Sequence, residues 1–174
     1  METKRLETER LIMRPFKKED ANRYFEITKD EAIQKYVPNA CPYSLEEALF
    51  DIETYYSKGD WIHDFYIALE DKETHDIVGA LIVYEDILKR YDMSIITAKE
   101  YRRMGYITEA LKAFKKLVKG KTLIFVIEKE NLPSIKTVKK LKCKEITKKY
   151  GRNCHVRVFI KNAWFFQAFL KFDT

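Results

Sequence analysis

The chain has 174 residues, of which 46% are hydrophobic and 34% charged, and its net charge is +6. This length and balance are typical of one globular domain and exclude a disordered chain. The N-terminal METKRLETER has no apolar core, and no apolar run approaches the roughly 20 residues of a membrane span. We therefore expect no signal peptide, no membrane partner and a cytoplasmic location.

The cysteines and histidines exclude two further classes of protein. The three cysteines are odd in number and form no C-x-x-C pair, and the three histidines are scattered singly. A disulfide framework or a zinc site needs paired or clustered ligands, so we expect neither disulfides nor a bound metal. The residues concerned are Cys41, Cys143, Cys154, His63, His75 and His155.

Positive charge is concentrated in the second half of the chain. Residues 112–149 hold 13 Lys and three Glu, whereas residues 1–111 are net acidic. A basic half favours an anionic partner and an acidic half a cationic one, although solvated helix faces explain most of the lysines without any partner. The sequence has no zinc finger, RNP motif or arginine-rich stripe, so we do not expect nucleic acid as a partner.

Alternating and helical patterns predict the elements of the first half. Residues 9–15 alternate as a strand, and residues 18–29 follow as a helix. Ser44 and Glu47 form an S-x-x-E capping box for a second helix that ends near Gly59. Residues 65–70 and 77–85 read as an antiparallel hairpin, because the polar DKETHD joins two apolar runs.

The second half alternates strands with helices. We predict a strand at 91–97, a helix of about four turns from Gly105 to just before Gly120, an apolar central strand at 123–127, a helix at 132–142 and a strand at 155–160. A hairpin followed by a β-α-β-α order predicts an α/β or α+β fold, with a mixed sheet and helices on its faces. Ligands of such sheets bind beyond the carboxyl ends of central strands.

The helix near Gly105 starts in an unusual way. In YRRMGYITEALKAFKKL, residues 101–117, no Ser, Thr, Asp or Asn caps the helix, and Arg102, Arg103 and Gly105 precede it instead. The first N–H groups of a helix lack internal partners and carry partial positive charge, so an anion suits them, and glycine lets it come close. The alternative is a solvated helix start with two surface arginines.

Four stretches together resemble the GNAT acetyltransferases, and within them the RimJ/RimL-like N-acetyltransferases of ribosomal-protein N-termini. They are LETERLIMRPFKKEDA, DIVGALIVYED, AKEYRRMGYITEAL and ENLPSIKTVKKLKCKE, which span Leu6 to Glu145 in the family's order. The resemblance implies a GNAT fold, with a mixed, mostly antiparallel central sheet flanked by helices on both faces. With the length of the chain, it predicts a single GNAT domain over residues 1–174, in which the family does not explain the aromatic-rich tail at 163–174.

The resemblance assigns a binding site for acetyl-CoA as co-substrate. The N–H groups of Arg103 to Thr108 would hold the pyrophosphate, although Arg103 and Ile107 stand where glycine or alanine is usual, and Ile107 would narrow the space there. Asn131 and Ser134 match an N-x-x-S segment, but a plain helix cap and a first-turn serine explain them equally. The implied cofactor residues are Ile96, Thr97, Arg102, Arg103, Met104, Gly105, Tyr106, Ile107, Thr108, Asn131 and Ser134.

The chemistry implied by the resemblance needs a base for the attacking amine. Glu85 and Asp92 are our two candidates for this base, although for either one alone the favoured alternative is a solvated strand-edge carboxylate. The tyrosine with which some relatives protonate the thiolate is absent, because Val138 stands there. Ser134 is therefore the candidate acid, and Tyr150 is a weaker one.

We thus expect an N-acetyltransferase that moves the acetyl group of acetyl-CoA to a primary amine, either a protein N-terminus or a small molecule. One alternative is a non-catalytic acyl-CoA sensor or interaction module on the same fold, and another is a ribosome- or RNA-associated protein. The tail AWFFQAFLKF, residues 163–172, either packs on its own sheet or forms a dimer contact or lid. The expected state is accordingly a monomer or a homodimer.

Overall fold

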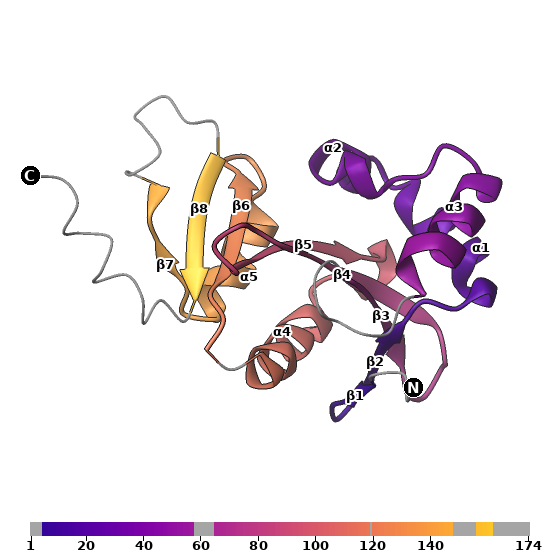
Figure 1. Cartoon of the computed structure of the whole chain (residues 1–174), viewed down its shortest axis with the longest axis horizontal. Coiled ribbons are helices and arrows are strands. Elements are labelled where there is room, and N and C mark those ends of the chain that lie inside the picture. The colour runs from indigo at the N-terminus through magenta and orange to yellow at the C-terminus, as the bar shows by residue number, and fades with distance from the viewer. Residues whose placement is uncertain (1–4, 58–64, 119, 148–155, 162–174) are drawn as a thin grey trace, which may run out of the picture.

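An eight-stranded sheet forms the centre of the protein (Figure 1). The computed structural model describes residues 5–57, 65–118, 120–147 and 156–161. Every pair of neighbouring strands is antiparallel except β5 and β6, which confirms the mixed, mostly antiparallel sheet. In spatial order the strands are β1 (Leu6–Glu7), β2 (Leu11–Pro15), β3 (Phe65–Asp71), β4 (Ile77–Glu85), β5 (Tyr91–Thr97), β6 (Leu123–Glu128), β8 (Val156–Lys161) and β7 (Lys144–Glu145).

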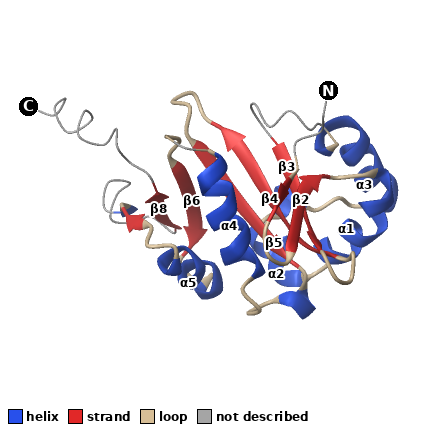
Figure 2. Ribbon diagram, turned by 90° about the horizontal axis from the view of Figure 1, so that it is seen from below, coloured by secondary structure: helices blue, strands red, loops and turns tan. Residues whose placement is uncertain are grey.

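Helices cover both faces of this sheet (Figure 2). On one face lie α4 (Tyr106–Leu117) and α5 (Leu132–Lys140), and on the other α1 (Ala21–Thr28), α2 (Glu31–Tyr36), α3 (Leu45–Asp51) and the π-helical turn η3 (Ile52–Tyr56). Short 3-10 turns are η1 (Lys18–Asp20), η2 (Pro38–Ala40) and η4 (Lys99–Tyr101). No helix within the described ranges is long and apolar enough to cross a membrane.

Strand alternation divides the core into two layers. On β4, Leu81 and Val83 pack in the cluster beneath α4 and α5, whereas Ala80 and Ile82 pack in the cluster beneath α1 to α3. Successive side chains of a strand point to opposite faces, so a strand covered on both sides is apolar throughout. This explains why IVGALIV reads as a continuous apolar run.

The predicted elements agree with the structure, but the two-residue edge strands β1 and β7 and the short helix α2 were not predicted. The helix predicted at 18–29 is observed as η1 and α1, but α2 follows at once and was not predicted. Asp30 separates the two helices, because its carboxylate accepts hydrogen bonds from the Ala32 and Ile33 N–H groups and so starts a new helix. Ser44 caps α3 as expected, although Glu47 reaches the Tyr43 N–H rather than that of Ser44.

The parallel ladder between β5 and β6 is only two residue pairs long. Tyr91 pairs with Leu123 and Asp92 with Ile124, after which the strands diverge. Figure 1 shows the resulting wedge, with β6, β7 and β8 on one side and β1 to β5 on the other. Because β5 and β6 are parallel, the wedge opens toward the ends from which the chain enters α4 and α5.

The backbones of β4 and β5 approach closely at Gly79. A Cβ atom there would lie 2.3 Å from the Ile96 carbonyl oxygen. We expect Gly79→Ala to lower the free energy of unfolding by about 1 to 3 kcal/mol, the usual cost of overpacking, because the two strands must separate. Urea unfolding measures this cost, and an unchanged midpoint would contradict the close contact.

Candidate active site

The turn before α4 presents a row of backbone N–H groups without partners. Arg103 (φ 67°) and Gly105 (φ 88°) both have left-handed backbone conformations. The first hydrogen bond of the helix runs from the Glu109 N–H to the Gly105 carbonyl at 3.1 Å. None of the six N–H groups from Arg103 to Thr108 donates to another residue in the described part of the chain. Such a concave row at a helix start is a site for an anion.

The β1–β2 turn holds this anion-binding turn in place. Arg10 donates from Nη1 to the Met104 carbonyl at 3.1 Å and from Nε to Glu109 at 2.8 Å. Thr8 donates to the other oxygen of Glu109 at 2.5 Å. Burial disfavours the charged form of Glu109, but these hydrogen bonds outweigh it and lower the pKa of the carboxyl. The one acidic group of the first turn is therefore neutralised by Arg10.

Tyr106 anchors the same turn to the sheet. Its hydroxyl donates to Asp71, at the end of β3, at 2.7 Å, and this hydrogen bond raises the pKa of the phenol. The Arg10 guanidinium lies 4.2 Å above the centre of its ring. Segments about 100 residues apart in sequence thus determine where the free N–H groups point.

The two arginines of the turn have different surroundings. Arg102 donates to Asp30 at 2.6 Å, which lowers the pKa of that carboxyl and ties the turn to the start of α2. Arg103 is exposed and forms no ion pair within the described residues. The cationic side chain available to an anion is therefore that of Arg103 rather than that of Arg102.

Several of the other predicted cofactor residues have side chains that are buried or paired within the fold. The Ile107 side chain is 9% exposed and belongs to the core beneath α4, so it takes no space in front of the turn. Ile96 is fully buried on the opposite face and pairs with Ala80 of β4. Thr97 pairs with Gly79, and Met104 is half exposed with its carbonyl bound to Arg10.

The edge of β5 that faces the wedge carries unpaired peptide groups. The Tyr91 N–H donates toward β6, to the Thr122 carbonyl at 2.9 Å, whereas the Ala98 N–H donates toward β4, to the Val78 carbonyl at 3.0 Å. Since peptide groups alternate along a strand, those of Ile95 and Thr97 point into the wedge, beyond the last pair with β6. A ligand chain in the wedge can pair with them as a strand would.

Asn131 and Ser134 stand at the other side of the open end, where β6 leads into α5. The Asn131 side chain caps α5 by accepting the Ser134 N–H at 3.2 Å, so the helix-cap interpretation is confirmed. The half-buried Ser134 hydroxyl forms no hydrogen bond among the residues that the structure describes. The weaker candidate acid, Tyr150, and the aromatic tail at 163–172 lie outside the described residues.

The two candidate bases lie on opposite faces of the sheet. Asp92 forms the last pair with β6, and its side chain is exposed on the face of α1 to α3. Partial desolvation, with the nearby Asp86 charge, raises the pKa of this carboxyl. Glu85 points to the α4 face, is 5% exposed, and pairs with Lys121 at 2.7 Å and Lys89 at 3.4 Å. Only Asp92 is thus brought to the closed end of the wedge.

The sequence of the chain matches a known domain over most of its length. Residues 10–144 match the family model described as an acetyltransferase (GNAT) domain. The chain belongs to the GNAT acetyltransferase family. As a GNAT protein it is an acetyl-CoA-dependent acyltransferase.

Known proteins agree with this assignment. YnaD of Bacillus subtilis, an uncharacterized N-acetyltransferase, is 27% identical over 140 residues, which are 77% of this chain and 79% of YnaD. A GNAT-family acetyltransferase from Bacillus anthracis has the same fold, with a TM-score of 0.71, 20% identity and coverage of 90% and 96% of the two chains. A ribosomal-protein-S5-alanine acetyltransferase from Vibrio fischeri matches with a TM-score of 0.67, 16% identity and coverage of 91% and 96%.

A group of tyrosines beside Asp92 was not predicted for this GNAT site. Tyr84 lies opposite Asp92 in the β4–β5 register, and its hydroxyl is 2.9 Å from that of Tyr66. The Tyr66 ring stacks on Tyr56 at 3.7 Å. Alternation separates the two faces of each strand, but only the register shows that Tyr66, Tyr84 and Asp92 share one face.

Substitution of Gly105 tests the turn of this GNAT enzyme. A Cβ atom there would be 3.6 Å from Arg10, so space is sufficient and the left-handed backbone is the constraint. Valine in this conformation costs roughly 1 to 2 kcal/mol, and relaxation of the turn misaligns the free N–H groups. We expect Gly105→Val to weaken acetyl-CoA binding at least about tenfold in calorimetric titration.

The matched control is Gly105→Asn, because asparagine accepts left-handed backbone. It should keep affinity within about threefold of the unsubstituted protein. Equal affinities for the valine variant and the unsubstituted protein would mean that the pyrophosphate lies elsewhere.

Proposed function

We propose that this acyltransferase transfers the acetyl group of acetyl-CoA to a primary amine, by direct attack within a ternary complex. The observation that carries the proposal is the wedge between β5 and β6, which has free N–H groups at its open end and Asp92 at its closed end. An anionic, chain-like co-substrate can enter from one side of the sheet and a cationic acceptor from the other.

Three sets of residues would position acetyl-CoA. The N–H groups from Arg103 to Thr108, with the exposed Arg103 side chain, would bind the pyrophosphate. The peptide groups of Ile95 and Thr97 would pair with the amides of the pantetheine arm. A hollow of about 800 Å³ bordered by Gly105 and Thr108 leaves room for the rest of the nucleotide.

Asp92 would act as the base for the amine. The carboxylate takes a proton from the ammonium form of the acceptor, directly or through a water molecule, and the free amine attacks the thioester carbonyl. The C–N bond forms, the C–S bond breaks and the CoA thiolate leaves. The attacking nitrogen loses its second proton as the amide forms, and the thiolate, to which the Ser134 hydroxyl would donate a hydrogen bond, takes up that proton to become the CoA thiol.

The acceptor is either a protein N-terminus or a small-molecule amine. An α-amino group has a pKa near 8, against about 10.4 for a lysine side chain, so a carboxylate such as Asp92 deprotonates it more easily. The description of the Vibrio fischeri relative as a ribosomal-protein acetyltransferase supports the same choice. We therefore place α-amines first, with peptides ahead of free amino acids.

Titration with acetyl-CoA, followed by an acceptor screen, tests the proposal. Micromolar binding together with acetylation of peptide N-termini supports the enzyme and its acceptor class. Binding without turnover on any amine would favour the non-catalytic acyl-CoA sensor. The buried Val138 supports that alternative, because it stands where some relatives have a catalytic tyrosine. Absence of binding would overturn both.

The role of Asp92 is tested by Asp92→Asn. We expect kcat to fall about 100-fold or more, with acetyl-CoA affinity unchanged, because general base catalysis is lost while the binding turn is intact. In the unsubstituted enzyme kcat/KM should rise with pH as Asp92 loses its proton, above the usual range of an aspartate because its pKa is raised. This rise of kcat/KM with pH should be absent from the Asp92→Asn variant.

Glu85→Gln is the control for that measurement, since it makes the same chemical change on the opposite face. It should keep kcat within about twofold. Equal losses in both variants would indicate a general electrostatic effect instead of base catalysis by Asp92.

Ser134→Ala separates the two interpretations of this serine. The helix cap uses the Ser134 N–H, so the variant keeps α5 intact. If its hydroxyl stabilises the thiolate, kcat should fall about tenfold while the Kd for acetyl-CoA stays the same. An unchanged kcat would make Ser134 an ordinary first-turn residue.

A further inference from the structure

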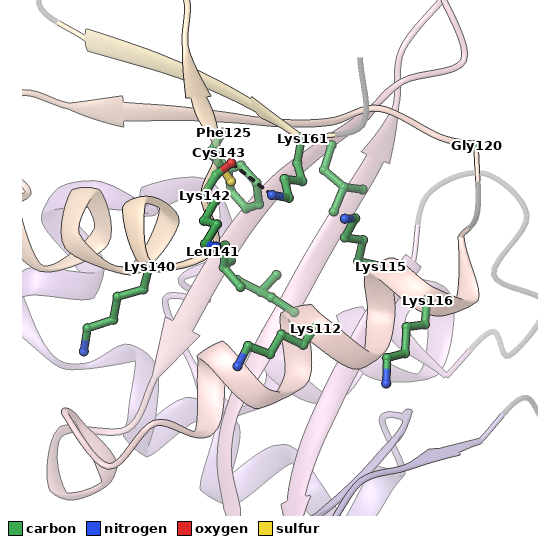
Figure 3. A pocket seen from close by; sticks show the side chains of 12 residues that line it. Lys112, Lys115, Lys116, Gly120, Phe125, Lys140, Leu141, Lys142, Cys143 and Lys161 are labelled. Atoms are coloured by element: carbon green, nitrogen blue, oxygen red, sulfur yellow. Dashed lines mark hydrogen bonds between the residues drawn. The ribbon is translucent and has the colours of Figure 1, made fainter. Parts of the chain in front are cut away.

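A second open hollow lies between the C-terminal halves of α4 and α5, above β6 (Figure 3). Its volume is about 860 Å³, within the range of ligand sites and peptide anchor sites. Its wall is formed by α4, the end of α5, strands β6 and β8, and the loops that follow the two helices. No step of the proposed acetyl transfer uses it.

Six lysines surround this hollow, which we name the basic hollow. None of their ammonium groups forms an ion pair with a carboxylate among the described residues, and Lys161 donates only to the Lys142 carbonyl, at 2.9 Å. Elsewhere in the described structure lysines such as Lys29, Lys72 and Lys121 have acidic partners. The six are Lys112, Lys115, Lys116, Lys140, Lys142 and Lys161.

Between these lysines the lining is apolar. Leu141 and Cys143 are partly buried and border the hollow together with Phe125. Burial raises the pKa of the Cys143 thiol even though Lys161 and Lys115 act in the opposite direction. Lysines on a solvated helix face need no such apolar surface between them. A ligand that fits this hollow would therefore carry apolar groups as well as negative charge.

The lining favours a peptide over nucleic acid. RNA sites combine cations with exposed aromatic rings or arginine planes on which bases stack. The lining residues include no arginine, and their single aromatic ring, Phe125, is 1% exposed. An amphipathic helical peptide matches this lining better. Its carboxylates would face the lysines at the rim and its aliphatic side chains would face the apolar floor, as in helix-in-groove recognition.

The basic hollow is also separate from the anion-binding turn. Its residues on α4 begin at Leu111, and Lys115 lies ten residues beyond Gly105, about 15 Å along the helix. None of the residues from Arg103 to Thr108 borders it. Lys112, Lys116 and Lys140 do reach the neighbouring hollow beside Gly105, so a test must distinguish the two.

We propose that the basic hollow is a docking site for a short acidic, amphipathic segment of a partner protein. Its carboxylates pair with the lysines of the rim, and its aliphatic side chains lie on the partly buried Leu141 and Cys143. Charge complementarity is the argument for this occupant, because lysines without partners attract an anion and repel another basic surface.

The probe is a fluorescein-labelled synthetic peptide of roughly 12 residues, with glutamates on one helical face and leucines at i, i+3 and i+7. Fluorescence anisotropy should show saturable binding to the full chain that weakens as salt rises. A peptide with glutamine in place of glutamate, and one with serine in place of leucine, should each bind at least about tenfold more weakly.

Variants locate the binding. The double variant Lys115→Glu with Lys161→Glu should weaken binding about tenfold or more, because both lysines lie beside Cys143. Lys136→Glu is the matched control, since Lys136 is exposed on α5 and does not line the hollow. Peptide should also slow alkylation of Cys143, but not of the equally half-buried Cys41, in peptide mapping.

Four outcomes would overturn the proposal. They are no saturable binding, equal weakening by Lys136→Glu, displacement of the peptide by acetyl-CoA, and tighter lysine-dependent binding of an RNA oligonucleotide than of the peptide. Displacement would assign the lysines to the co-substrate and leave the acetyltransferase proposal standing. Failure of peptide binding likewise leaves acetyl-CoA binding unaffected, so the two proposals fail independently.

Discussion

The peptide groups of β5 need partners on both edges, and only one edge supplies them along the whole strand. Toward β4 the antiparallel ladder runs from Tyr91 to Thr97 without a break. Toward β6 it stops after Asp92 and Ile124. Because an unpaired peptide group away from water is costly, the open edge has to face either solvent or a ligand. The wedge follows from this interruption, and the turn before α4 and Asp92 lie at its open and closed ends.

Much of the fold could be predicted because it depends on local patterns. The 3-4-7 spacing of Ile107, Ala110, Leu111 and Phe114 indicates α4, and the missing cap at Gly105 indicates an anion at its start. Alternation and turn composition locate the β3–β4 hairpin. The short helix α2 escaped prediction because its signal is a single residue, Asp30, within a stretch already assigned to the end of α1.

The geometry of the candidate site could be predicted from the sequence only where it consists of backbone groups. The N–H groups from Arg103 to Thr108 depend on helix geometry, which is local. Which carboxylate reaches the wedge depends on strand register, and this separates Asp92 from Glu85 although they are seven residues apart. The partners of Arg102 and Glu109 are likewise distant in sequence, Asp30 and Arg10, and no periodicity reveals such pairs.

The two-pair ladder has a thermodynamic consequence. Strands β6, β7 and β8 join the rest of the sheet through a seam that contributes few hydrogen bonds of its own. If acetyl-CoA pairs with both sides of the wedge, it completes the sheet as an interior strand would, and folding becomes linked to ligand concentration. A ligand at 100 times its Kd adds about 2.7 kcal/mol to the free energy of unfolding. The concentration of acetyl-CoA would then affect the stability of the folded protein as well as the rate of the reaction.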